Sequence, residues 1–390
     1  MKTNWPLFSN QEIKKVSQIL RSGKVNYWTG TEGKLFEKEF SSFFKIKYSV
    51  AVANASLALE CALKSIGIKK NDDVIVTSKS YISSASCVVN IGANPIFSDV
   101  DLNSQNITVD SIKKIITKNT KAIICVHLGG FPCDMIKIKK FAKTRKIKII
   151  EDCSQSHGAS INKKFTGSFG DIAVWSFCNE KIISTGEGGM ISTNSKKIWE
   201  KIWSTKEIGK NFYLSRKKKQ SNLKFRWLHN SFGTNLRMTE IQSAIGRIQL
   251  KKLKSFIKER KFNANIINKI FSKFEFIIVP QVPKNIEHAF YRYYVRIDKA
   301  KLKKGWSRDR ILKKLNQMGI MSNQGSCSEI YLEKCFKNQK IGPATRLKNA
   351  KLLGEQSVAF IVDPRLNINK IIKKQEYIQK IFSSASKIKQ

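Results

Sequence analysis

Short apolar runs and longer amphipathic stretches alternate along the first half of the chain. The apolar runs are typical of buried strands and cover residues 48–53, 73–77, 95–100, 122–126, 148–152, 171–177 and 189–193. Helical spacing of apolar residues is found between them, at 56–66, 82–91, 108–117 and 134–145. This alternation predicts an α/β protein with a mostly parallel sheet covered by helices.

The pattern changes at both ends of this region. Two helices are expected before it, at 10–22 with Asn10 as N-cap and at 34–43. A long helical pattern at 239–271 is expected to bridge to a second, smaller α+β unit with a strand at 291–297 and helices at 308–318 and 344–358. We therefore predict a large domain at 1–245 and a small C-terminal domain at 246–390.

Residues 205–227 show no clear period and contain Arg216 followed by three lysines at 217–219. A long loop fits this composition best. It is either a solvated basic loop or a mobile loop that covers an anionic ligand, since such loops often carry function.

Charge is the most conspicuous feature of the composition. The 390 residues carry a formal net charge of +43, yet 41% hydrophobic and 10% aromatic residues exclude a disordered polycation. Nucleic-acid binding is one explanation. However, the 59 lysines outnumber the 13 arginines and are spread along the whole chain. Because Lys, Ile and Asn are favoured by A+T-rich coding, we attribute the charge to coding bias and do not expect nucleic acid as a partner.

The cysteines and the N-terminal residues indicate the cellular compartment in which the protein is expected. The eight cysteines include no C-x-x-C pair, and none of the four histidines pairs with them at zinc spacing, so no metal site is expected. The N-terminus lacks an apolar signal core, and no run approaches ~18 apolar residues. These observations predict a cytoplasmic protein in a reducing compartment.

Residues 148–193 contain the most informative chemistry. Asp152 ends a buried strand, at the edge of the sheet where α/β proteins bind ligands. A buried carboxylate there needs a cationic partner. Lys181 follows the next strand and precedes a Gly-rich turn, and a lysine near such a cleft can act as an amine nucleophile.

Around these two residues the chain resembles the DegT/DnrJ/EryC1/StrS family of sugar aminotransferases, which are fold-type-I enzymes that use pyridoxal 5′-phosphate (PLP). The resemblance extends over almost the whole chain. It includes the blocks NYWTGTEGKLFEKEF (26–40), VANASLAL (52–59), VHLGGFPCDM (126–135), KIIEDCSQSHGA (148–159), GSFGDIAVWSF (167–177), CNEKIISTGEGGMIST (178–193), GTNLRMTEIQSA (233–244), HAFYRYYVRI (288–297) and GSCSEIYLEK (325–334). It implies a large mixed, mostly parallel sheet domain and a smaller C-terminal domain.

The resemblance assigns the catalytic pair and the residues around the cofactor ring. Lys181 takes the position of the Schiff-base lysine. Asp152 takes that of the carboxylate that keeps the pyridine nitrogen protonated, without which the ring is no electron sink. Gln155 is implied to contact the ring oxygen, and Tyr81 to stack on the ring.

The same resemblance implies a phosphate site. Ala55, Ser56 and Ser176 take the positions of its backbone and hydroxyl donors, at the start of a helix and the end of a strand. Asn235 matches a residue that reaches the phosphate from the neighbouring subunit, which implies a homodimer with shared active sites. The family often has F-S-F-H-P before the lysine. Here WSFCNEK replaces it, so the usual histidine is absent.

The implied activity is amino transfer, from L-glutamate as donor, to a nucleotide-linked keto-sugar for surface polysaccharide or glycan biosynthesis. Arg237 and the 216–219 loop are candidates for contact with the substrate diphosphate. Two alternatives remain open. One is a related PLP-dependent nucleotide-sugar dehydratase, whose family members carry His in place of the lysine, and the other is a non-catalytic polyanion-binding protein.

Overall fold

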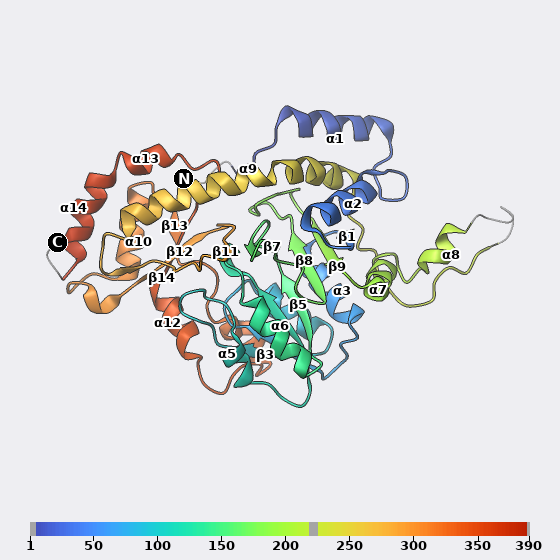
Figure 1. Ribbon diagram of the computed structural model, residues 1–390, viewed down its shortest axis with the longest axis horizontal. Helices are drawn as coiled ribbons and strands as arrows, with labels where there is room; N and C mark the ends of the chain where they lie inside the picture. The colour runs from blue at the N-terminus through green and yellow to red at the C-terminus, as the bar shows by residue number, and fades with distance from the viewer. Residues whose placement is uncertain (1–4, 218–224, 388–390) are drawn as a thin grey trace.

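A seven-stranded sheet forms the centre of the protein, whose computed structural model describes residues 5–217 and 225–387 (Figure 1). Its strands in spatial order are β1 (Tyr48–Val52), β9 (Gly189–Thr193), β8 (Ile172–Ser176), β5 (Lys148–Asp152), β4 (Thr120–Val126), β2 (Asp73–Thr77) and β3 (Asn94–Ser98). Strands β8, β5, β4, β2 and β3 run parallel, and β9 is antiparallel to both of its neighbours. The predicted α/β class with a mixed, mostly parallel sheet is confirmed.

Helices cover both faces of this sheet, which explains why consecutive residues in the middle of its strands are apolar. In β2, Val74 and Val76 pack in one core cluster and Ile75 packs in another, on the opposite face. The first face is covered by α3 (Ala55–Ser65), α4 (Ser83–Asn90) and α7 (Lys196–Lys206). The second face is covered by α2 (Glu32–Phe44), α5 (Val109–Lys113), α6 (Met135–Thr144) and the first half of α9 (Glu240–Phe271).

Helix α9 connects the large sheet and its helices to a second hydrophobic core, which is built around a smaller sheet. Its 32 residues begin after the N-cap Thr239, whose hydroxyl accepts from Gln242 N–H. The helix passes α1 (Asn10–Ser22) and α2 and reaches a four-stranded sheet at the other end of the molecule (Figure 1). That sheet has the order β10 (Ile277–Ile278), β12 (Tyr293–Ile297), β14 (Ser357–Phe360) and β13 (Ser322–Asn323). Packed with it are α10 (Arg308–Gln317), α13 (Ile368–Ile372) and α14 (Gln375–Ala385).

The segment between β13 and β14 returns to the large sheet. Ile330, Tyr331 and Phe336 are buried in the same core cluster as α3 and α4. They belong to η3 (Ile330–Leu332) and α11 (Lys334–Asn338), which precede α12 (Lys348–Gln356). The remaining elements are η1 (Leu128–Gly130), η2 (Lys299–Lys301), α8 (Phe212–Arg216) and a small sheet of β11 (Ile286–Glu287), β6 (Ser160–Ile161) and β7 (Lys164–Phe165). The predicted division at residue 245 stays a prediction.

Three local predictions are wrong. Helix α1 is capped by Ser9 and not by Asn10, because the Glu12 carboxylate accepts from Ser9 N–H at 2.9 Å in a capping box. The expected loop at 205–227 contains the end of α7 and all of α8, whose Phe212 packs on Trp199 and Trp203. Lysines 218 and 219 lie outside the described residues.

The third error concerns the expected helix at 344–358. It is confined to α12, and the apolar residues after Gln356 form β14. This strand pairs with β12 on one side and β13 on the other, which a helical pattern in the sequence does not reveal.

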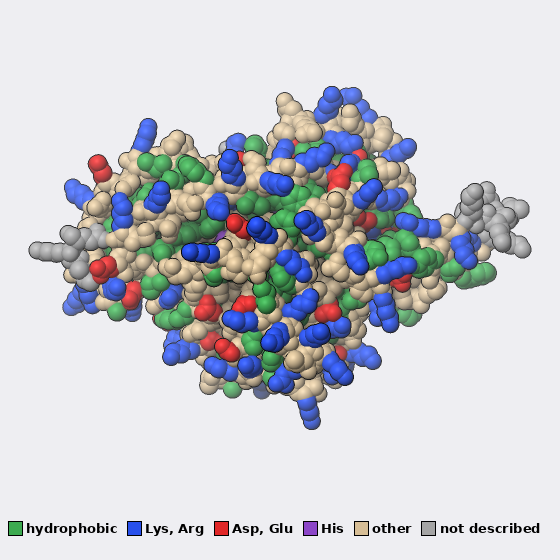
Figure 2. Space-filling view, viewed as in Figure 1, with side chains coloured by type: hydrophobic (Ala, Val, Ile, Leu, Met, Phe, Trp, Pro, Cys, Tyr) green, Lys and Arg blue, Asp and Glu red, His purple; other side chains and the backbone are tan. Residues whose placement is uncertain are grey.

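On the face drawn in Figure 2, Lys and Arg side chains occur over all parts of the molecule and are not gathered in one patch. None of the helices in the described ranges is long and apolar enough to cross a membrane.

Candidate active site

A cavity of about 830 Å³ opens at the carboxyl ends of β5 and β8 and the N-terminal ends of α3 and α4. This is the edge at which α/β sheets bind ligands. Seven of the eight site residues predicted from the sequence line it: Ala55, Ser56, Tyr81, Asp152, Gln155, Ser176 and Lys181. They come from four separate segments of the chain, and the fold brings them together.

Asp152 is the last residue of β5 and is only 5% exposed. One carboxylate oxygen accepts from Ser154 N–H at 3.0 Å, and the other accepts from the Ser84 hydroxyl at 3.4 Å. No Lys, Arg or His of the described residues lies within 4.0 Å of this carboxylate. A buried carboxylate without a protein cation is suited to a cationic group supplied by a ligand.

Lys181 lies on the loop between β8 and β9, and its side chain enters the cavity. Its ammonium nitrogen is 5.0 Å from the centre of the Tyr291 ring. The main chain is held at both ends, because Lys181 N–H donates to the Cys178 carbonyl and the Trp5 indole donates to the Lys181 carbonyl. These main-chain contacts fix the loop that carries the Lys181 amine.

Gln155 and Tyr81 both line the cavity. The amide oxygen of Gln155 accepts from Gly129 N–H at 2.7 Å, which orients its amide nitrogen as a donor for another group. Gln155 is 5% exposed, whereas Tyr81 is 68% exposed at the mouth. An exposed aromatic ring at a cavity mouth can stack on a planar ligand.

The N-terminal end of α3 forms a cradle for an anion. Asn54 is the N-cap and accepts from Leu57 N–H at 2.9 Å, so the chain enters the helix with the N–H groups of Ala55 and Ser56 in its first turn. The Ser56 hydroxyl lies 2.8 Å from the Ser83 hydroxyl at the start of α4. Backbone N–H groups and hydroxyls at a helix N-terminus suit a phosphate.

Strand β9 passes directly beneath this cradle at a glycine. A Cβ atom on Gly189 would lie 2.7 Å from the Asn54 carbonyl carbon and 3.0 Å from the Ala55 nitrogen. Ser176, at the end of β8, places its hydroxyl near the same end of the cavity and accepts from Cys178 N–H at 3.3 Å. The start of β9 lies so close to the start of α3 that only glycine, which has no side chain, fits at position 189.

The eighth predicted residue, Asn235, is exposed and does not line the cavity of its own chain. It forms a β-bridge with Glu207. Arg237, a candidate for contact with a diphosphate, does not line the cavity either, and its guanidinium donates to the buried Glu207 carboxylate at 2.8 Å. Trp28 donates to the same carboxylate oxygen at 3.0 Å. The role of Asn235 across a subunit interface stays a prediction.

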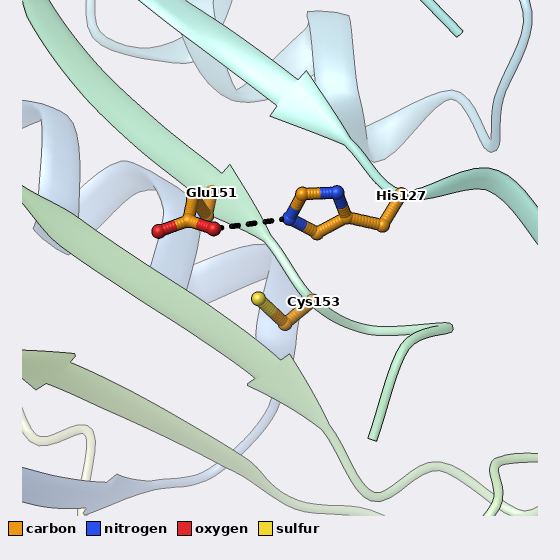
Figure 3. A group of neighbouring side chains, drawn as sticks. All are labelled: His127, Glu151 and Cys153. Carbon is orange, nitrogen blue, oxygen red and sulfur yellow. Dashed lines mark hydrogen bonds and ion pairs between the residues drawn. The ribbon is translucent and has the colours of Figure 1, made fainter. Parts of the chain in front are cut away.

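Beside Asp152, three buried side chains have the composition of a metal site: His127, Glu151 and Cys153 (Figure 3). Their ligand atoms lie within 4.8 Å of one another. However, both Glu151 oxygens already accept hydrogen bonds, one from Phe169 N–H and Gly170 N–H and the other from Gly167 N–H and His127. A metal ion would have to displace these donors.

The same cluster is better explained as an anchor for the end of β5. Cys133 N–H donates to His127 Nδ1 at 3.0 Å, so Nε2 carries the proton that is donated to Glu151. Burial alone would raise the pKa of the Glu151 carboxyl, but the hydrogen bonds from His127, Gly170 and Gly167 hold that pKa below its ordinary value. These contacts fix the backbone beside Asp152.

The donor set of the cavity fits PLP. It combines a lysine amine, a buried carboxylate without a protein cation, an amide donor and a phosphate cradle. Sequence reasoning missed Ser84, Tyr291, Glu180 and Arg292, which line the same cavity. Ser84 and Arg292 lie in segments that are near Asp152 and Lys181 only in the folded chain, so spacing gave no signal for them.

Fold and site together define a PLP-dependent enzyme of the aminotransferase fold. Residues 6–376 match the DegT/DnrJ/EryC1/StrS aminotransferase family, and the chain belongs to it. It is 35% identical over 293 residues to GDP-perosamine synthase from Escherichia coli O157:H7, which covers 74% of this chain and 75% of that protein. The predicted family, aminotransferase class and PLP cofactor are confirmed.

Two solved structures show how far the similarity of fold extends. An aminotransferase from Psychrobacter cryohalolentis has a TM-score of 0.95 and 44% identity, with 98% of each chain covered. A GDP-4-keto-6-deoxymannose-3-dehydratase with a trapped PLP–glutamate geminal diamine has a TM-score of 0.86 and 27% identity, covering 96% of this chain and all of that one. The fold is therefore shared by transaminases and by a dehydratase.

Proposed function

We propose that this enzyme transfers an amino group from L-glutamate to the keto group of a nucleotide-linked sugar, for surface polysaccharide or glycan biosynthesis. The observation that carries the proposal is the pair of Lys181 and Asp152 in one cavity, with a phosphate cradle at its end. The name of the GDP-perosamine synthase relative supports a nucleotide-sugar substrate.

The residues of the cavity divide the work as follows. PLP, when bound, supplies an electron sink for the carbon–nitrogen chemistry. Asp152 would keep a proton on the ring nitrogen by its negative charge, and the Gln155 amide nitrogen would be the donor for the ring oxygen. Ser56, Ser176 and the first turn of α3 would hold the phosphate. Lys181 moves the proton at the substrate carbon with its amine.

The dehydratase alternative is favoured only by the similarity of fold. In the related dehydratases a histidine replaces the lysine, and here Lys181 is present. A panel of nucleotide-linked keto-sugars, incubated with the PLP-loaded enzyme and L-glutamate, tests the choice. Amino-sugar and 2-oxoglutarate in equal amounts support the proposal. A deoxy-sugar without a new amino group, or no reaction with any sugar in a broad panel, contradicts it.

We also propose a homodimer in which Asn235 completes the partner's site. The segment before Asn235 exposes three large aromatic side chains, Phe225, Trp227 and Phe232, at 76%, 83% and 104% of their full accessible surface. Such surfaces in a folded protein indicate an interface. Mixing inactive Lys181→Ala and Asn235→Ala proteins tests the sharing. Mixed dimers regain one intact site only if Asn235 acts across the interface.

The polyanion-binding alternative is tested separately. A DNA mobility-shift assay at increasing salt, beside the PLP spectrum, distinguishes it from the enzyme. Tight DNA binding by a protein that does not retain PLP would favour that alternative.

A further inference from the structure

More acidic than basic side chains line the described part of the cavity. Among the described lining residues, Asp152, Glu180 and Glu187 are acidic, and Lys181 and Arg292 are basic. Lys181 is assigned to the cofactor in the proposed function. Arg292 is then the lining cation that remains for an anionic substrate group.

Arg292 is held rigidly. Its main-chain N–H donates to the Gly129 carbonyl at 3.2 Å, just before β12 begins. One guanidinium nitrogen donates to the Tyr291 carbonyl at 3.3 Å, and the guanidinium carbon lies 4.5 Å from the centre of the Tyr291 ring. Its side chain is 13% exposed. An arginine this deeply placed is costly to leave without a counter-ion.

Its counter-ion is held loosely. Glu180 pairs with Arg292 at 2.9 Å, and the Glu180 side chain is 70% exposed. Removing Glu180 from the pair returns a carboxylate to water at little cost, whereas moving Arg292 would break its contacts with Tyr291. Glu180 is therefore the partner that can move.

The location relates Arg292 to the reacting amine. The Lys181 amine and the Arg292 guanidinium lie against the same Tyr291 ring, at 5.0 and 4.5 Å from its centre. In an amino-acid donor, the carboxylate carbon is two bonds from the reacting nitrogen. In a nucleotide-linked keto-sugar, several bonds of the sugar ring separate the diphosphate from the keto carbon. A carboxylate near the reacting atoms therefore fits the position of Arg292 better.

From these contacts we infer that Arg292 binds the carboxylate of the amino-acid donor and that Glu180 is an exchangeable counter-ion. The inference rests on the proposed function and deepens it. When the donor enters, its carboxylate replaces that of Glu180 on the guanidinium, and Glu180 moves into solvent. When the keto-sugar occupies the cavity without such a carboxylate, Glu180 pairs with Arg292 again. One cavity thus accepts two unlike substrates without leaving an unpaired buried charge.

The kinetic test separates the two half-reactions. Arg292→Gln is expected to raise KM for L-glutamate at least about tenfold, the worth of a charge-assisted hydrogen bond, with KM for the keto-sugar unchanged. Glu180→Gln is expected to leave or lower KM for L-glutamate and to raise KM for the keto-sugar. Glu187→Gln, which removes the same negative charge from another cavity carboxylate, corrects the Glu180→Gln result for the general effect of charge.

A binding measurement independent of turnover completes the test. Glutarate has two carboxylates and no amino group, so it binds the PLP-loaded enzyme without reacting. Calorimetry should show its affinity reduced at least about tenfold by Arg292→Gln and partly restored by Arg292→Lys. Unchanged glutarate affinity in Arg292→Gln, or a rise in KM for the keto-sugar alone, overturns the inference. A wild-type enzyme that does not bind PLP or convert L-glutamate refutes the proposed function instead.

Discussion

The indole nitrogen of Trp5 donates a hydrogen bond of 2.8 Å to the main-chain carbonyl of Lys181. The two residues are 176 positions apart in the chain. The Trp5 ring packs edge-on against Phe256 of α9 at 4.9 Å, so the N-terminal segment is held by the long helix and in turn holds the loop that carries the lysine. A residue outside the cavity therefore helps to fix the position of its amine.

Replacing Trp5 by Phe keeps an aromatic ring against α9 and removes the donor. We expect a loss of about 1 kcal/mol in the free energy of unfolding and weaker retention of PLP, because the Lys181 carbonyl loses its partner. Denaturant titration and dialysis of the cofactor measure the two effects. Trp199→Phe is the control, since the Trp199 indole makes no hydrogen bond within the described part of the chain.

Lys181→Ala removes the amine. Amino transfer should fall by about four orders of magnitude, and the visible absorbance of lysine-bound PLP should disappear. Circular dichroism and thermal unfolding establish that the variant is folded. Full transaminase activity in a folded Lys181→Ala protein would contradict the assignment.

Asp152→Asn keeps the shape of the side chain and removes its charge. We expect at least a 100-fold lower rate, since the amide does not hold a proton on the cofactor ring nitrogen. The rate of PLP conversion by L-glutamate, followed without any sugar, is the measurement. The same substitution at the exposed Asp110 should have no effect on that rate.

Gly189→Ala introduces a methyl group less than 3.1 Å from the Asn54–Ala55 peptide. The N-terminal end of α3 must shift, at a cost of about 1–3 kcal/mol, and the PLP dissociation constant should rise tenfold or more. Fluorescence titration of the apoenzyme with PLP measures this. Gly342→Ala, whose new methyl group meets the nearest atom at an ordinary 3.4 Å, should leave PLP affinity unchanged.

Lys79 should make stability depend on pH. It is 1% exposed, its amine donates to the Ser357 hydroxyl at 2.9 Å, and burial together with the charge of Arg308 lowers its pKa to about 7 from an ordinary 10.5. Between these two values the unfolded chain binds more protons than the folded one. The contribution of Lys79 to the free energy of unfolding therefore rises with pH from about 7 to 10, by at most about 1.4 kcal/mol per unit.

The measurement is a comparison of wild type with Lys79→Met by denaturant unfolding across this pH range. Subtraction removes the titration of all other groups. The difference between the two proteins should increase with pH in favour of wild type, whereas Lys118→Met, at an exposed lysine, should show a constant difference. A flat curve for Lys79→Met would mean that the amine is charged in the fold throughout.

The sequence predicted most of the large sheet because each of its strands contains a short run of apolar residues. Strands β2, β5 and β9 have the expected bounds, and seven predicted residues meet at one cavity. The wrong predictions concern contacts between distant segments, which the pattern of neighbouring residues does not reveal. Phe212 anchors α8 through rings on α7, and β14 is a strand because it has two partners. The pair of Arg292 and Glu180 joins segments 112 residues apart, so neither residue stood out among 101 charged ones.

The packing of Ile330, Tyr331 and Phe336 in the large-sheet core means that this core is completed late during synthesis on the ribosome. All seven strands of that sheet have been made once residue 193 is added, but the apolar faces of α3 and α4 receive their last covering side chains only much later. Until then, part of this core is exposed, a state prone to association with other chains. The C-terminal third of the chain is thus needed to shield the apolar faces of α3 and α4, whose N-terminal ends form part of the cofactor cavity, from other chains.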